Sequence, residues 1–372
     1  MAFSAIINNP TATLPFVGDL PGALWTWGFN GDAETGDGNQ TSPKITPAAM
    51  ATHTFVKVAY GRRHAIGLKS DGSVWTWGEN ISGALGTGDT TLRNVPYDIG
   101  ITGALDVAGG WSFSVILKSD GSMWGSGTNG YGQLGTGGGA VTSFTAATGG
   151  NFFTKIACGS DPFGSDSTIA LKSSGEVWGC GDSTYGQTNG TTLSKLSSGS
   201  DIYREVYSAG ISVMAIKTSD DQAYGRGYNG TGALGTGNNT NQSTFTVQAG
   251  GNTYSKLALG VRFGLGLKID GSVYGWGGPV SGIFTPSSST PASIFAGPYT
   301  DLACNPFDNG GCTASVLDAS GNMYSWGDNT LYNFGTTSAS PSSSASLVAS
   351  VSGTTFTRLL KTQSFTNGAI KV

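Results

Sequence analysis

This chain of 372 residues contains little charge and almost no histidine. Charged side chains make up 11% of it, whereas a typical soluble domain has roughly 25%. The net charge is −4 and no run of lysine or arginine occurs, so the sequence lacks the basic footprint of a nucleic-acid-binding protein. His53 and His64 are the only histidines, which leaves little material for histidine-based catalysis.

Long apolar segments are also missing. No stretch approaches the roughly 18 residues that a membrane-spanning helix needs, so we expect no membrane insertion. Residues 1–10 contain no lysine or arginine and no long apolar run, so we expect no secretory signal peptide. The four cysteines lack the spacing of a metal site. Cys304 and Cys312 flank one short loop and can form a local disulfide, although unpaired small hydrophobic residues are the favoured interpretation.

Glycine is abundant, at 61 of 372 residues, and one motif occurs seven times. The motif is a tryptophan or tyrosine followed by two residues and a glycine, and in several copies Gly-x-Leu-Gly-Thr-Gly follows. The residue before its last glycine lies at positions 27, 77, 126, 180, 226, 276 and 326, which gives steps of 46 to 54 residues. A period of this size indicates a solenoid, a propeller or another repeat array.

The best-formed repeat predicts four antiparallel strands. Residues 55–60, 64–69 and 73–77 are rich in β-forming residues, and residues 95–99 can supply a short outer strand. Asp71-Gly72 predicts a two-residue hairpin in which both central residues have φ above zero. In the loop that follows the third strand, the leucine is expected to fill the core while the glycines adopt backbone angles that other residues avoid.

Such a sheet is apolar on both faces and needs a neighbour on each side, which a closed ring provides. The last segment repeats the first two strands of a unit, and the chain begins with a third strand at residues 24–27. We therefore expect an all-β fold, a seven-bladed β-propeller whose N- and C-terminal strands close one shared blade. Residues 1–19 are expected to form an arm that packs on its own propeller or on an adjacent subunit, and residues 20–372 the propeller. The expected blades are approximately 55–100, 105–148, 153–198, 203–248, 253–298, 299–349, and 354–372 plus 20–50.

The repeat resembles that of the regulator of chromosome condensation family, whose members are seven-bladed β-propellers. The resemblance is carried by LKSDGSVWTWG at residues 68–78 and GALGTG at residues 83–88, and it extends over about residues 20–372. It implies the fold but does not select a function. The family includes guanine-nucleotide exchange factors, a secreted β-lactamase inhibitory protein, ubiquitin-ligase modules and phage virion proteins.

This sequence departs from the nucleotide-exchange members of that family. Eukaryotic members usually carry a histidine in the second strand of several blades. Here only His64 fits, while Phe113, Val213 and Phe263 occupy the equivalent places. No insertion resembles the wedge that the exchange factor uses. A nucleotide-exchange function is therefore less favoured.

Two repeats are lengthened at the same turn, between their first and second strands. The lengthened segments are residues 157–164 and 303–309, and in each a phenylalanine follows a proline. Equivalent loops project from one face, and arginine and aromatic residues are typical of contact surfaces. The alternative is that each phenylalanine folds back on its own loop. The candidate partner surface comprises Arg62, Arg63, Trp111, Phe113, Asp161, Phe163, Arg262, Phe263 and Phe307.

Other candidate sites have simpler interpretations. His64 is interpreted as a packed strand residue, and the glycines of residues 135–139 as turn residues, because no P-loop lysine or helix follows them. Asp32, Asp37 and Asn39 do not match the spacing of a calcium loop. We predict no catalytic residue, no metal site and no cofactor.

These observations favour a non-enzymatic structural and interaction protein. The first hypothesis is a bacteriophage virion component of the tail, fibre or capsid surface, made in the host cytoplasm. Low charge, richness in glycine, serine, threonine and asparagine, and the missing signal peptide motivate it. Its expected partners are other protein subunits of a particle, or a host surface protein or glycan. The alternative is a bacterial adhesin or an inhibitor-type binding propeller.

Overall fold

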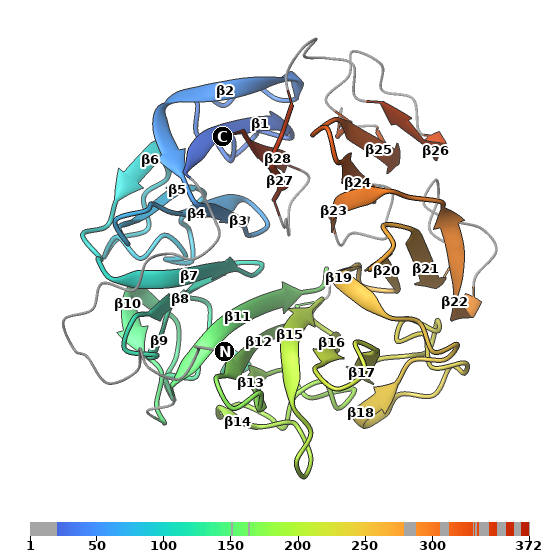
Figure 1. Ribbon diagram of the computed structural model, residues 1–372. Helices are drawn as coiled ribbons and strands as arrows, with labels where there is room; N and C mark the ends of the chain where they lie inside the picture. The colour runs from blue at the N-terminus through green and yellow to red at the C-terminus, as the bar shows by residue number, and fades with distance from the viewer. Residues whose placement is uncertain are drawn as a thin grey trace, which may run out of the picture.

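The runs of β-forming residues fold into strands that pair as seven antiparallel four-stranded sheets. The computed structural model describes residues 21–149, 152–162, 164–278, 288–305, 312–329, 331, 333–334, 342–347, 355–360 and 366–371. These residues contain 28 strands and no helix. The sheets are arranged as the blades of a propeller around one axis (Figure 1), which confirms the predicted fold. The predicted N-terminal arm lies outside the described residues.

We call the sheets blades A to G in the order in which they follow one another around the ring. Blade A comprises β27 (Arg358–Leu359), β28 (Thr366–Lys371), β1 (Gly22–Gly28) and β2 (Lys44–Phe55). Blade B comprises β3 (Lys57–Tyr60), β4 (His64–Leu68), β5 (Val74–Gly78) and β6 (Arg93–Asp98). Blade C comprises β7 (Ala104–Gly109), β8 (Phe113–Lys118), β9 (Met123–Gly127) and β10 (Val141–Ala146). Blade D comprises β11 (Phe153–Ser160), β12 (Asp166–Lys172), β13 (Val177–Gly181) and β14 (Ser194–Lys195). Blade E comprises β15 (Tyr203–Ser208), β16 (Ser212–Lys217), β17 (Ala223–Gly227) and β18 (Gln242–Val247). Blade F comprises β19 (Tyr254–Leu259), β20 (Phe263–Lys268), β21 (Val273–Gly277) and β22 (Ser288–Phe295). Blade G comprises β23 (Tyr299–Cys304), β24 (Thr313–Asp318), β25 (Met323–Gly327) and β26 (Ser342–Leu347).

Blade A joins the two ends of the chain. Strand β1 pairs antiparallel with β28, in a continuous register from Ala23 opposite Lys371 to Gly28 opposite Thr366. The sequence prediction of a blade shared by both termini is therefore confirmed. Because β1 and β28 belong to opposite ends of the sequence, their hydrogen bonds hold the ring closed.

The first strand of each blade lies innermost and the fourth lies at the rim (Figure 1). Neighbouring first strands contact each other, as β7 and β11 do. Since the strands of a blade alternate in direction, the connections between first and second strands and between third and fourth strands lie at one end of the ring. We call this end the loop face. The opposite end carries the hairpins between second and third strands, and we call it the turn face.

The turn-face hairpins differ from the sequence prediction. In blade B the Lys69 amide donates to the Ser73 oxygen and the Gly72 amide to the Lys69 oxygen, both at 3.0 Å, so the loop has three residues. Of Asp71 and Gly72 only the glycine has a positive φ, of 80°. A type I turn followed by a left-handed glycine satisfies both observations, so the expected two-residue turn is wrong. Equivalent glycines with φ from 78° to 81° are Gly121, Gly175, Gly271 and Gly321.

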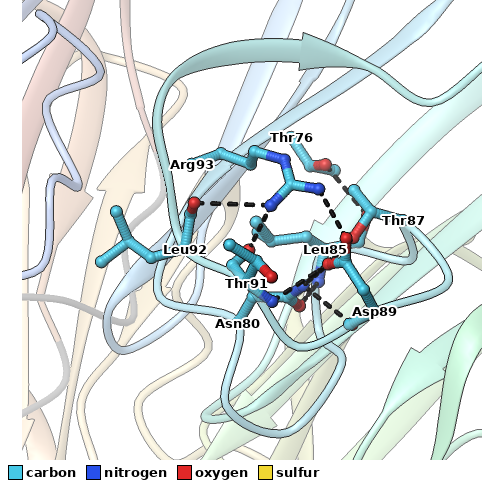
Figure 2. A network of polar contacts seen from close by, with 8 residues as sticks. All are labelled: Thr76, Asn80, Leu85, Thr87, Asp89, Thr91, Leu92 and Arg93. Carbon is cyan, nitrogen blue, oxygen red and sulfur yellow. Dashed lines mark hydrogen bonds and ion pairs between the residues drawn. The ribbon is translucent and has the colours of Figure 1, made fainter.

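A buried asparagine fixes the loop that follows the third strand in five of the seven blades. In blade B the Asn80 Oδ1 accepts a hydrogen bond from the Leu85 amide at 2.9 Å, and its Nδ2 donates to the Thr87 Oγ1 at 3.1 Å (Figure 2). Arg93 and Asp89 close the same loop with an ion pair of 2.7 Å (Figure 2). Leu85 is thereby held in the core, fully buried as predicted. Equivalent bonds are accepted by Asn30, Asn129, Asn229 and Asn329.

Candidate partner-binding face

The predicted arginine and tryptophan side chains lie at the loop face, on loops that are tied to one another. The Arg62 amide donates to the Trp111 oxygen at 3.2 Å, and the Arg62 guanidinium lies 4.3 Å from the centroid of the Trp111 ring. The Trp111 amide in turn donates to the Ser160 Oγ at 2.7 Å. Loops of blades B, C and D are therefore linked in sequence, and a cation–π contact covers the first of the two junctions.

Glycines at the ends of the first strands allow these loops to approach so closely. A Cβ on Gly61 would lie 2.5 Å from the Gly110 oxygen, and one on Gly109 would lie 2.7 Å from the Gly61 nitrogen. Both distances are shorter than nonbonded atoms tolerate, and both atoms belong to the backbone of the neighbouring blade. At Gly61 a Cβ would also meet the His64 ring. The glycine that ends each strand therefore sets the spacing at which Arg62 can stack on Trp111.

Arg63 is the second cation of this region and lies between two carboxylates. Its guanidinium is 3.4 Å from the Asp32 Oδ2 and 3.4 Å from the Glu79 Oε1. Its side chain keeps 36% of its surface exposed. Arg262 is exposed on the equivalent loop of blade F. These side chains are accessible to a partner at the loop face.

Two other members of the predicted surface lie in the core. Phe113 and Phe263 are fully buried, so the prediction that they belong to a contact surface is wrong for both. They lie opposite Gly127 and Gly277, as His64 lies opposite Gly78, and this register directs the side chain into the core. Phe163 and Phe307 lie outside the described residues.

Asp161 is also buried, with 2% of its surface exposed. Its Oδ1 accepts a hydrogen bond from the Ser165 amide at 2.7 Å, so it shapes the lengthened loop from inside. In the second strand of blade E, the residue opposite Gly227 is Ser212. The expectation that Val213 occupies the His64 position is therefore wrong by one residue.

His64 is a core residue, as the sequence analysis favoured. It is 2% exposed, and its Nε2 forms a hydrogen bond of 2.9 Å with the Ser114 Oγ of the next blade. Burial lowers the pKa of His64 to about 4, so the ring is neutral at physiological pH. It stabilises the junction of blades B and C.

Sequence analysis missed a buried carboxyl group at the loop face of blade A. Glu34 is fully buried, and its Oε2 accepts a hydrogen bond from the Asp32 amide at 3.0 Å. Burial raises the pKa of Glu34 to about 8. The Glu34 Oε1 and the neighbouring Tyr60 hydroxyl have no hydrogen-bond partner among the described residues. The sequence did contain a signal for this site, because Glu34 is the one charged residue among these equivalent positions of the repeat. The others hold Ala84, Gln133, Ala233 and Asn333.

A second buried carboxyl group begins β12, next to the lengthened loop of blade D. The Gln133 Nε2 donates to the Asp166 Oδ2 at 3.0 Å. Burial raises the pKa of Asp166 to about 7, and the charges of Asp161 and Asp182 add to this effect. Within the described part of the chain, no group of acidic, histidine or cysteine side chains is arranged to hold a metal ion. Across the same residues, no helix is long and apolar enough to cross a membrane.

Comparison with protein families identifies the repeat. Residues 71–117 match the model described as "Regulator of chromosome condensation (RCC1) repeat". A second model of the same repeat matches residues 55–84, 105–133 and 153–187. These segments span blades B, C and much of D, so the chain contains repeats of this kind. None of the curated proteins matches the sequence.

Solved structures show the same fold. Human WBSCR16 is 18% identical, with a TM-score of 0.80, over 94% of this chain and 100% of that one. Prp20p from Saccharomyces cerevisiae, described with its binding to Gsp1p and histones, is 17% identical, with a TM-score of 0.78 over 95% of this chain and 92% of its own. Yeast RCC1 (Prp20) bound to Kap60 is 17% identical, with a TM-score of 0.78 over 95% of this chain and 90% of its own. At these identities the likeness concerns the fold.

Proposed function

We propose that this seven-bladed propeller, built from regulator of chromosome condensation repeats, is a non-enzymatic protein-binding platform that uses its loop face. The observation that carries the proposal is the stack of Arg62 on Trp111. Arginine and tryptophan dominate the energetics of protein interfaces, particularly where neighbouring groups hold them in place. Here the hydrogen bonds from the Arg62 amide and from the Trp111 amide order the pair before any partner arrives, which reduces the entropy lost on binding.

The proposed partners are proteins. Prp20p, which has the same fold, binds Gsp1p and histones, and RCC1 binds Kap60. These examples support the use of a propeller of this shape as a binding surface. The loop face of this chain offers the exposed Arg262 and two half-buried arginines to acidic groups, and the half-buried Trp111 to apolar ones. We infer that the partner presents both kinds of group.

Variants of the paired residues test the loop face. We expect Arg62→Ala and Trp111→Ala each to weaken binding of the partner at least about tenfold, equivalent to about 1.4 kcal/mol. The matched control is the pair on the turn face in which Lys69 lies 3.7 Å from the centroid of the Trp75 ring. Lys69→Ala and Trp75→Ala should leave affinity unchanged. The affinity of the purified chain for a cross-linked and identified partner is the measurement. Loss of binding only in the control pair would assign the interaction to the turn face.

We further propose that the platform works within a bacteriophage virion, in the tail, fibre or capsid surface. Other subunits of the particle, or a host surface protein or glycan, are then its partners. The composition supports this proposal, because 11% charge and 61 glycines suit a subunit whose surface is largely covered by neighbours. Mass spectrometry of purified particles from the source should find the chain in stoichiometric amounts. Its presence only in cytosol or culture medium would favour an adhesin or inhibitor-type propeller instead.

A further inference from the structure

Each blade places one charged residue at the same position of its innermost strand. In every case this residue lies opposite the last apolar residue of the second strand, as Lys57 lies opposite Leu68 and Arg358 opposite Ile370. We call these residues the axial ring. In order around the propeller they are Lys57, Asp106, Lys155, Glu205, Lys256, Asp301 and Arg358. The sign of the charge alternates from blade to blade, in a chain that has few charged residues.

Three ion pairs join neighbouring members of the axial ring. Lys57 pairs with Asp106 between blades B and C, and Lys155 pairs with Glu205 between blades D and E. Lys256 pairs with Asp301 between blades F and G. The two aspartate side chains are only 15% and 12% exposed, so these pairs are better shielded from water than ordinary surface ion pairs.

Each aspartate also reaches the blade on its other side. The Asp106 Oδ2 accepts a hydrogen bond from the Ile156 amide of blade D at 3.3 Å. The Asp301 Oδ2 accepts one from the Leu359 amide of blade A at 2.7 Å. Beside Glu205, the Arg204 guanidinium donates to the Tyr254 oxygen of blade F at 2.6 Å. Each acidic blade is thus connected to the blade before it and to the blade after it.

We propose that the axial ring closes the propeller through three clamps, one on each acidic blade, of which the second is completed by Arg204, and through Arg358. The clamps connect blades B, C and D, then D, E and F, then F, G and A, which accounts for six of the seven blade junctions. At the seventh, the Arg358 guanidinium donates to the Val56 oxygen of blade B. Alternation of charge cannot be complete around an odd number of blades. The one pair of like charges falls at this junction, where Arg358 is followed by Lys57, and the propeller opens there first.

Exchanging the charges within one ion pair tests this inference. In the double variant Lys57→Asp with Asp106→Lys, the ring still has one pair of like charges, but it moves to the junction of blades C and D. The second double variant, Lys256→Asp with Asp301→Lys, exchanges the charges of blades F and G. It raises the number of neighbouring pairs with like charge from one to three. Both variants have the same composition, and in each the replaced aspartate loses hydrogen bonds from two backbone amides, one in its own blade and one in the next. We expect the second variant to unfold at a clearly lower temperature than the first. Equal unfolding temperatures would overturn the proposal.

Hydrogen exchange of the unmodified chain provides a test that does not depend on folding of the variants. Strands β3, β11 and β19 are the innermost strands of the three lysine blades, and none of them is a terminal strand. We expect the amides of β3, at the A–B junction, to exchange at least tenfold faster than those of β11 and β19. In the first double variant, fast exchange should move to β11. Slower exchange in β3 than in both other strands would contradict the assignment of the weak junction.

Discussion

The indole Nε1 of Trp77 donates a hydrogen bond of 2.8 Å to the backbone oxygen of Glu34 in the preceding blade. Trp27 and Trp276 make the same bond, each at 2.8 Å, to the oxygens of Asn333 and Ala233. Blades without tryptophan at this position use another donor: Ser126, Cys180 and Arg226 reach the oxygens of Gly83, Gln133 and Gly186. In these six blades the residue before the motif's last glycine therefore connects consecutive blades in addition to filling the core, whereas the Trp326 Nε1 of blade G has no hydrogen-bond partner among the described residues.

Substitution Trp77→Phe separates these two roles. Phenylalanine retains most of the apolar volume but cannot donate, so it leaves the Glu34 oxygen without this bond in a fully buried place. We expect the free energy of unfolding to fall by about 2–4 kcal/mol, from a lost buried hydrogen bond and a partly unfilled core. Urea unfolding monitored by circular dichroism measures it.

Trp75→Phe is the matched control for this substitution. Trp75 is half-buried, and its Nε1 donates to the Ser73 Oγ of its own blade at 3.2 Å. Trp75 also contacts the His53 ring of blade A, 4.8 Å between centroids. Its replacement by phenylalanine keeps an aromatic ring at that contact and removes no hydrogen bond between blades, so the cost should be clearly smaller. Equal costs for the two variants would show that the bond between blades contributes nothing of its own.

Glu34→Gln is expected to change how stability depends on pH. Burial raises the pKa of Glu34 to about 8 in the folded chain, from an ordinary 4.5. Below pH 4.5 the group is protonated in both the folded and the unfolded chain, so its ionisation does not lower the free energy of unfolding. As the pH rises from 4.5 to 8, the unfolded chain ionises while the folded chain does not, and stability falls by up to about 1.4 kcal/mol per pH unit. The glutamine variant should lose this decline.

Unfolding measured at several values between pH 4.5 and 8 therefore gives curves that separate as the pH rises, with the variant above the wild type. Glu176→Gln supplies a control of opposite sign. The Glu176 carboxylate accepts a hydrogen bond from Lys195 at 2.7 Å, and this lowers its pKa. Its replacement should reduce stability slightly toward neutral pH. Parallel curves for wild type and Glu34→Gln would contradict the assignment of the buried carboxyl.

The fold could be predicted from the repeat because each element depends on adjacent residues and the same pattern occurs seven times. Strand, hairpin glycine and buried leucine each follow from a few adjacent residues, and Leu85 shows this well. The ring closure followed from counting the half-repeats at the two ends. The turn around Asp71-Gly72 was misjudged because two-residue and three-residue hairpins share the same dipeptide.

The candidate surface was harder to predict because exposure at the end of a strand depends on register. Arg62 and Phe113 lie near equivalent loops, yet one is at the surface and the other is in the core. Glu34 escaped notice because an acidic residue in a polar loop usually faces water. The alternating charges of the axial ring were visible in the sequence, but only the closed ring makes Arg358 the neighbour of Lys57.

Gly72→Ala tests the left-handed conformation of Gly72 that the three-residue turn requires. Gly72 has a φ of 80°, and a Cβ there would lie 3.0 Å from the Gly103 nitrogen. An alanine in this left-handed conformation costs about 1–2 kcal/mol. Gly130→Ala is the control, because that glycine has no positive φ and open space where the Cβ would be. It should leave stability unchanged or raise it by about 0.5 kcal/mol. Thermal unfolding compares the two, and equal midpoints would refute the left-handed conformation of Gly72.

The lengthened loops of blades D and G carry the last prediction, which follows from their sequence. Phe163 and Phe307 each follow a proline in a polar loop, and large apolar side chains in such places often anchor a partner. The double variant Phe163→Ala with Phe307→Ala should leave the unfolding temperature unchanged and weaken the partner interaction. Phe152→Ala is the control, because Phe152 precedes β11 at the turn face with 73% of its surface exposed. If the double variant binds as the wild type does, each phenylalanine packs on its own loop, and the contact surface reduces to the arginines and Trp111.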